Sequence, residues 1–196
     1  MKKFVYLASQ SPRRRQLLTQ IGVSHELLIA SPDEDVEALE VVLAGEAPLT
    51  YVKRVTQLKL EAAVSRMKHR DLPNAPILCA DTTVAIGRQI LGKPKDAKDA
   101  LRILKILSGR THRVLTAVAV AANRKRAISV SVSQVTFAPM KLAQIQTYIA
   151  SGEPMGKAGA YGVQGLAATY ISEIKGSYSG IMGLPLFETA QLLRQI

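Results

Sequence analysis

The chain has 196 residues, 47% of them hydrophobic, which is enough for one folded domain with a core and excludes a disordered polypeptide. The formal net charge of +11 indicates an acidic partner such as a nucleotide, a nucleic acid or an anionic membrane. Cys79 is the only cysteine and the three histidines lie far apart in sequence, which excludes a disulfide framework and a thiolate zinc cluster.

The N-terminal half alternates predicted strands and helices. FVYLAS is an expected strand, too short and too closely followed by arginines to be a signal peptide or a membrane span, so the cytoplasm is the simplest compartment. Residues 31–40, SPDEDVEALE, form an acidic loop that runs into a short helix. The remaining elements expected here are a helix over 12–21, a strand over 25–30, an amphipathic helix over 49–70 and a strand over 76–86 broken at Asp81–Thr83.

The C-terminal half begins with a helix over 97–107 that Asp96 caps. ISVSVS places valines and serines on opposite faces, and the apolar phase changes after it, which predicts a bulge near Ser133–Gln134. The other expected elements are a strand over 114–122, a charged turn over 123–126, a helix over 142–150, a glycine-rich segment over 152–165, a strand over 168–174, a turn at GSYSG and a helix over 186–196. No repeat or linker interrupts this order, so we expect a single α/β domain with a mixed sheet.

Three consecutive arginines, Arg13 to Arg15, follow Ser11 and Pro12 in the first turn of a predicted helix. Cations are unfavourable at this end of the helix dipole, whereas anions are stabilised there. The arrangement therefore favours a phosphate-binding site, although arginines that simply extend into water are an alternative.

Asp81 follows the apolar run ILCA, where a carboxylate is costly to bury unless it is paired, coordinated or at the mouth of a strand. Such a carboxylate can activate water or hold a divalent cation, or it can bond the backbone of a turn. Lys59 and Lys93 could reach into a site or remain solvated, and Glu34 lies in an acid run where spacing does not single out one metal ligand.

GEPMGKAGAYGVQG, residues 152–165, lets the backbone turn at positive φ or approach a ligand closely. It lacks the spacing and the final Ser or Thr of a Walker A loop, and no strand–GxGxxG–helix unit is present. GSYSG is not a hydrolase elbow, because its middle residue is Tyr178.

Six segments in order resemble the Maf family of nucleoside triphosphate pyrophosphatases over nearly the whole chain, from Leu7 to about Leu193. They are LASQSPRRRQLL, ADTTV, LGKPKDA, LSGRTHRVLTAV, GKAGAYGVQG and KGSYSGIMGLPLFET. The resemblance implies that residues 1–196 are one Maf-like domain with an elongated mixed sheet flanked by helices, similar to inosine-triphosphate pyrophosphatases. It also implies a homodimer and hydrolysis of a nucleoside triphosphate to the monophosphate and pyrophosphate, with Mg²⁺ or Mn²⁺.

The same resemblance implies residue roles. Asp81 corresponds to the catalytic acceptor of the water proton and to a metal ligand, and Glu34 to the metal-binding acid. The substrate-selecting residues are Arg13, Thr82 and Gln164, and the phosphate-contacting residues are Ser9, Arg14, Lys59 and Lys93. GKAGAYGVQG and GSYSGIMGLPL resemble the subgroup that acts on dTTP, UTP and some modified uridine triphosphates, and a Gln164 amide can pair with the uracil edge.

The sequence departs from the family between Asp35 and Leu49, which is longer than usual, so Asp33, Asp35 or Glu37 could replace Glu34. Two other functions fit parts of the sequence. A basic nucleic-acid-binding domain explains the charge but gives no role to Asp81, and a nucleotide-binding regulator without turnover gives no role to intact Asp81, Lys59 and Lys93. A triphosphate substrate explains more, because cationic side chains and a divalent cation would neutralise its charge.

Overall fold

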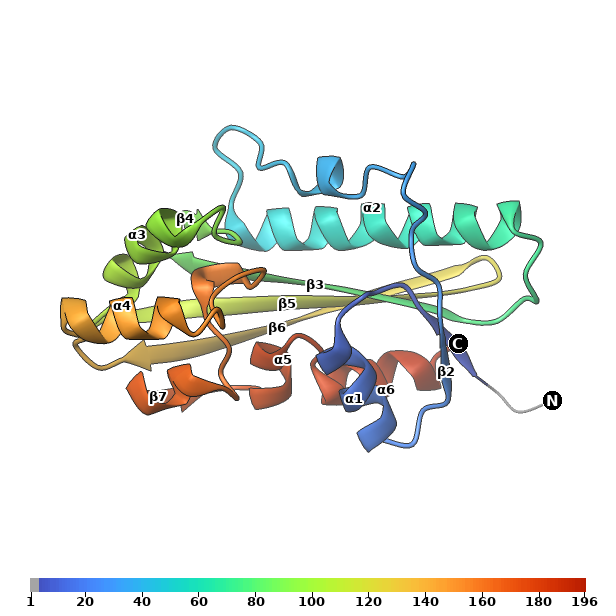
Figure 1. The fold of residues 1–196 in the computed structure, drawn as a ribbon. Helices are drawn as coiled ribbons and strands as arrows, with labels where there is room; N and C mark the ends of the chain where they lie inside the picture. Colours follow the sequence, from blue (N-terminus) through green and yellow to red (C-terminus); the bar gives the residue numbers. More distant parts are fainter. Residues whose placement is uncertain (1–3) are drawn as a thin grey trace.

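The computed structural model describes residues 4–196, which form a seven-stranded mixed sheet with helices on both faces. The longest strands, Ile77–Ile86 (β3), Thr111–Ala122 (β5) and Lys125–Phe137 (β6), run the length of an elongated molecule, and the long helix Pro48–His69 (α2) lies along one face (Figure 1). The strands are β1 (Val5–Leu7), β2 (His25–Leu27), β3 (Ile77–Ile86), β4 (Gln89–Leu91), β5 (Thr111–Ala122), β6 (Lys125–Phe137) and β7 (Ile171–Lys175). The helices are α1 (Pro12–Gln20), α2 (Pro48–His69), α3 (Ala97–Leu107), α4 (Leu142–Ala150), α5 (Tyr178–Met182) and α6 (Leu186–Arg194). The expected single α/β domain with an elongated mixed sheet is confirmed.

The strand order is β2-β1-β3-β5-β6-β7, and β4 pairs with the far end of β3. β1 runs parallel to β2 and β3, whereas the pairs from β3 to β7 are antiparallel. Short 3₁₀ turns lie at Glu37–Glu40, Ala158–Ala160 and Leu166–Tyr170. None of the helices in residues 4–196 is both long and apolar enough to cross a membrane.

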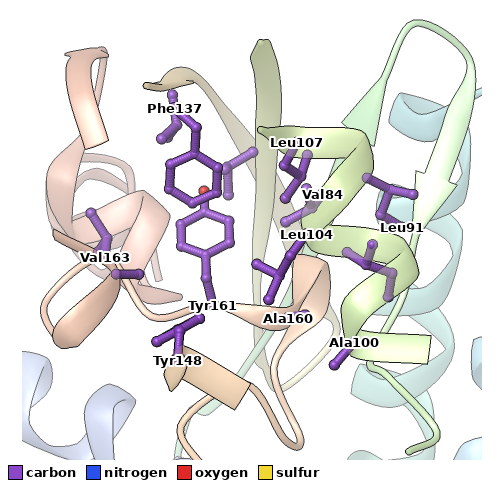
Figure 2. Packing of buried hydrophobic residues seen from close by; sticks show 14 of the residues in the cluster. Val84, Leu91, Ala100, Leu104, Leu107, Phe137, Tyr148, Ala160, Tyr161 and Val163 are labelled. Atoms are coloured by element: carbon purple, nitrogen blue, oxygen red, sulfur yellow. The ribbon is translucent and has the colours of Figure 1, made fainter. Parts of the chain in front are cut away.

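Helices cover the two faces of the sheet unequally. α2 packs on one face and α1 and α6 pack on the opposite face (Figure 1). Val52 and Leu60 of α2 belong to the core of the first face, and Leu18 of α1 belongs to that of the second. A third layer of core lies beneath α3 and α4, where Phe137, Tyr161 and Val84 come together (Figure 2). Each fully buried side chain of this kind stabilises the fold by roughly 1.5–3 kcal/mol relative to exposure.

Local sequence signals placed several helices accurately. α3 and α4 have the predicted bounds, and the Asp96 carboxylate accepts a hydrogen bond from the Asp99 amide at 2.7 Å. Ser11 precedes α1 as expected, but its hydroxyl makes no capping bond. GSYSG was expected to be a turn and is instead the start of α5, capped by Ser177.

Two strand predictions were wrong. β3 is not broken at Asp81–Thr83, because all ten of its residues are extended and these three pair with β5. β6 has no bulge near Ser133–Gln134, where it pairs with β5 in unbroken register; the register shift lies between Thr136 and Phe137, opposite β7. Ser133 is buried and its hydroxyl bonds the Ser177 backbone, so serines share the inward face with Phe137.

Candidate functional site

A large cavity of about 870 Å³ lies beside the edge of β3. β1 pairs with β3 only as far as Leu78, and β4 pairs with it only from Val84 onward, so the edge between them carries no strand. The cavity is lined there by Asp81 and Thr82, and by parts of the β1–α1 loop, residues 28–40, α2, residues 156–163 and residues 181–183. An unpaired edge inside a fold of this size leaves room for a ligand.

Eight of the nine residues predicted for the site line this cavity. They are Ser9, Arg13, Arg14, Glu34, Lys59, Asp81, Thr82 and Lys93. The ninth, Gln164, is exposed and is not part of the lining, although its neighbour Val163 is. The role of Gln164 in substrate selection stays a prediction.

Asp81 and Thr82 serve opposite faces of the sheet, because consecutive side chains of a strand alternate. Asp81 is 8% exposed and faces α2, where Lys59 donates a hydrogen bond to its Oδ1 at 2.6 Å. Thr82 faces the other way and accepts hydrogen bonds from Arg14 at 3.4 Å and from Thr116 at 3.0 Å. The cavity therefore has two walls of different chemistry.

The first wall, here called the lysine–carboxylate wall, consists of Lys59, Lys93, Asp81 and Glu40. Lys59 Nζ bonds Glu40 Oε1 as well as Asp81, each at 2.6 Å, and Lys93 Nζ lies 3.0 Å from Glu40 Oε2. Burial opposes the charge of Lys59, but the two carboxylates outweigh it and raise its pKa. Burial also opposes the charge of Glu40, and the two lysines outweigh it and lower its pKa. The formal charges of two lysines and two carboxylates cancel, so the wall is neutral overall.

Glu34 lies apart from this cluster. Arg66 holds both of its carboxylate oxygens, at 2.6 Å for the closest contact, and the Ser31 hydroxyl bonds it at 3.0 Å. The hydrogen bonds from Arg66 hold the pKa of Glu34 at about 2. Glu34 lines the cavity, but its oxygens are engaged by Arg66, so its metal-binding role stays a prediction.

The second wall, here called the arginine wall, consists of Arg13, Arg14 and Lys157. Arg13 donates to the Met182 carbonyl at 3.2 Å, and Arg14 donates to the Gly183 carbonyl at 2.7 Å and to Ser9 Oγ at 3.1 Å. The arginines therefore do not extend into water; only Arg15 is exposed. Burial lowers the pKa of both Arg13 and Arg14.

Lys157 belongs to the glycine-rich segment, and its ammonium donates to the Glu153 carbonyl. Burial lowers its pKa, and the charge of Arg13 lowers it further. The segment comes close to β3 at Gly159, which has a φ of 72° and where a Cβ would lie 2.8 Å from Val84. Glycine is required there, because the chain must both turn and pass the sheet closely.

The glycine-rich segment is joined to the sheet by a hydrogen bond between Tyr161 and His112. Tyr161 lines the cavity, and its hydroxyl lies 2.8 Å from His112 Nε2, which comes from β5. His112 is 2% exposed, and burial lowers its pKa to about 4, so the ring is neutral at pH 7. Its Nδ1 is buried without a hydrogen-bond partner in the structure.

Residues 4–196 contain no group of three His, Cys, Asp or Glu side chains arranged to hold a metal. A divalent cation with few protein ligands still fits the cavity. Lys59 bonds only Oδ1 of Asp81, which leaves Oδ2 available, and Mg²⁺ commonly takes one or two carboxylates together with substrate phosphates and water.

Three site residues were not identified from the sequence. Glu40 lies in the acidic segment but farther along than the acids considered there. Arg66 lies seven residues after Lys59, a spacing that puts both on one face of α2. Lys157 was part of the glycine-rich segment, whose lysine carried no separate signal.

Comparison with known proteins gives three kinds of finding. The family model described as Maf-like protein matches residues 4–196. Similar curated proteins named dTTP/UTP pyrophosphatase come from Albidiferax ferrireducens (67% identity; 99% of this chain, 97% of that one) and Polaromonas sp. (68%; 97% and 95%). The Ham1 protein of Staphylococcus aureus is a solved structure with a TM-score of 0.46 and 15% identity, over 71% of this chain and 74% of that one.

Proposed function

The chain belongs to the Maf-like protein family, and on that premise we propose that it is a nucleoside triphosphate pyrophosphatase. Its substrates are dTTP and UTP, with modified uridine triphosphates as further candidates, and its products are the nucleoside monophosphate and pyrophosphate. The observation that carries the proposal is the pairing of Asp81 with Lys59 at the open edge of β3, in the same cavity that the arginine wall lines. The names of the similar proteins, aligned over nearly the whole chain, support the substrate class.

In this mechanism Asp81 accepts the proton of the attacking water as the bond between the α and β phosphates breaks. Lys59 and Lys93 contact phosphate oxygens and reduce the repulsion that an incoming nucleophile meets. Arg13 and Lys157 bring positive charge from the other wall, and Arg14 orders Ser9, Thr82 and the loop at Gly183 around them. Arg13, Thr82 and Gln164 select the base.

A divalent cation, Mg²⁺ or Mn²⁺, completes the proposal. Asp81 Oδ2 would hold it, together with the phosphates and with Glu34 if that carboxylate leaves Arg66. When bound, it neutralises phosphate charge and lowers the pKa of coordinated water. We further place the protein in the cytoplasm as a homodimer, which light scattering after size-exclusion chromatography would test.

The proposal is tested by pyrophosphate release from dTTP, UTP, CTP, dATP and 7-methyl-GTP with Mg²⁺ or Mn²⁺, using wild-type protein and Asp81→Ala. We expect release from dTTP and UTP that is lost in the variant. Activity on 7-methyl-GTP alone would contradict the subgroup and the role of Gln164. No release from any nucleotide by folded protein would contradict the enzyme.

The competing function, a basic domain that binds nucleic acid without catalysis, is not favoured. It leaves the buried Asp81–Lys59 pair without a role, and the family and the similar proteins support the hydrolase. Salt-dependent binding to duplex DNA without triphosphate hydrolysis would reverse this order.

A further inference from the structure

The segment between β2 and α2 crosses the mouth of the site as a strap, defined here as residues 35–47. Polar contacts to α2 hold it: the Tyr51 hydroxyl donates to the Glu40 carbonyl at 2.9 Å, and Arg54 donates to the Val41 carbonyl at 2.9 Å and binds Glu46 at 2.7 Å. The Glu46 side chain is 5% exposed, whereas the other strap residues are half-buried or exposed, with Val41 60% exposed. Because little apolar surface is buried beneath it, the strap can leave its position at small cost.

Four strap residues line the cavity, and Glu40 is the one among them that is bonded to its lysines. Both oxygens of Glu40 contact Lys93 Nζ, at 3.0 and 3.3 Å, and Oε1 also accepts from Lys59 Nζ at 2.6 Å. The carboxylate thus uses the two ammonium groups that the proposed function assigns to substrate phosphates. An ammonium has three donors, and Lys59 already gives one to Asp81 and one to Glu40.

We propose that Glu40 is a built-in competitor for the phosphate groups of the substrate. Its carboxylate occupies Lys59 and Lys93 in the free protein and leaves them when a triphosphate binds, while Asp81 keeps its bond to Lys59. The inference rests on the proposed function and adds regulation of substrate affinity at the same site. The apparent affinity is then reduced by the fraction of molecules in which Glu40 covers the lysines.

The test compares Glu40→Gln with Glu37→Gln, which removes the same charge from the same 3₁₀ turn but is not bonded to either lysine. Calorimetry measures binding of inorganic tripolyphosphate with divalent cations chelated, so that metal coordination cannot contribute. We expect Glu40→Gln to bind about tenfold more tightly than wild type, and Glu37→Gln to change binding less than about twofold. With dTTP and metal, KM should fall in Glu40→Gln and stay close to wild type in Glu37→Gln.

An equal gain in tripolyphosphate affinity in both variants would overturn the proposal, because the gain would then come from the loss of one negative charge near the cavity and not from release of the lysines. Weaker binding in Glu40→Gln would also overturn it, since Glu40 would instead be positioning the lysines. Failure of tripolyphosphate to bind any of the three proteins would overturn it as well. Tighter tripolyphosphate binding without hydrolysis of dTTP would support the competitor and contradict only the proposed enzyme activity. Thermal unfolding of each variant shows whether it is folded.

Discussion

Both walls of the cavity carry cationic side chains, but the partners that these side chains bond to differ in charge between the walls. On the lysine–carboxylate wall, Lys59 and Lys93 each contact a carboxylate at 3.0 Å or less. On the arginine wall, the hydrogen bonds of Arg13, Arg14 and Lys157 go to carbonyl and hydroxyl oxygens, and none of these cations forms a salt bridge within residues 4–196. One wall is neutral and the other carries net positive charge.

The difference separates two tasks. Carbonyl and hydroxyl oxygens carry no net charge, so they leave the positive charge of the arginine wall uncompensated. This wall can therefore attract anions before any side chain moves. On the lysine–carboxylate wall, carboxylates already occupy donors of Lys59 and Lys93 and offset their charge, so this wall attracts an anion less strongly, while the bond from Lys59 holds Asp81 in place. We infer that the arginine wall attracts the triphosphate and that the lysine–carboxylate wall carries out the chemistry.

Lys59→Met should have the largest effect, because it leaves Asp81 and Glu40 without the cation they share. Removing one partner of a buried ion pair costs about 3–5 kcal/mol, and we expect kcat to fall by at least about a hundredfold, in line with loss of a charge stabiliser. Urea unfolding and pyrophosphate release measure the two effects. Adding Glu40→Gln to Lys59→Met should recover part of the lost unfolding free energy, because it removes one of the two unpaired carboxylates. A double variant no more stable than Lys59→Met would show that Glu40 does not depend on Lys59.

Arg14→Met should have the next largest effect, because Arg14 donates hydrogen bonds to Gly183, Ser9 and Thr82. Leaving these acceptors without their charged donor should cost about 3 kcal/mol of unfolding free energy. The control is Arg15→Met, an exposed neighbour that should change stability by less than about 0.5 kcal/mol. Equal losses in the two variants would show that Arg14 has no special structural role.

Lowering the pH should reduce the free energy of unfolding through protonation of His112, which is hydrogen-bonded to Tyr161 in the segment that carries Lys157. The pKa of His112 is about 4 in the folded protein against 6.5 for the free side chain, so the unfolded chain binds its proton first. Stability should therefore fall as pH drops from about 6.5 to about 4, by about 3 kcal/mol in total. Urea unfolding across this range should show a shallower pH dependence in His112→Gln; a slope equal to wild type would assign the titration to another group.

Lys157→Met should have a smaller effect than these variants and sharpens the comparison of the walls. It removes a cation without a carboxylate partner, so tripolyphosphate should bind about tenfold more weakly, equivalent to about 1.4 kcal/mol. Lys93→Met removes a cation that Glu40 already neutralises and should weaken binding only about threefold. Calorimetry on both variants makes the comparison, and the opposite order would contradict the division of charge.

Much of the fold follows from local sequence. The bounds of α3 and α4 agree with the prediction because helical periodicity and the glycine that follows each helix act over a few neighbouring residues, and α3 also has an acidic cap in Asp96. The strand errors have one cause. Buried serines and a buried aspartate look like breaks in a strand, but Ser133 and Asp81 are paired by Ser177 and Lys59 from distant parts of the chain.

The sequence by itself indicated the family and most of the elements, although not β4 or α5, and eight of the nine residues that it singled out for the site line the cavity. Only the tertiary structure decided which cation meets which carboxylate. Glu34 and Glu40 lie six residues apart, yet one bonds Arg66 and the other bonds Lys59 and Lys93. The local sequence around an acidic residue does not specify which cation it will meet, because an ion pair joins side chains that are distant in sequence. The partners are decided by where the sheet edge, α2 and the strap come together.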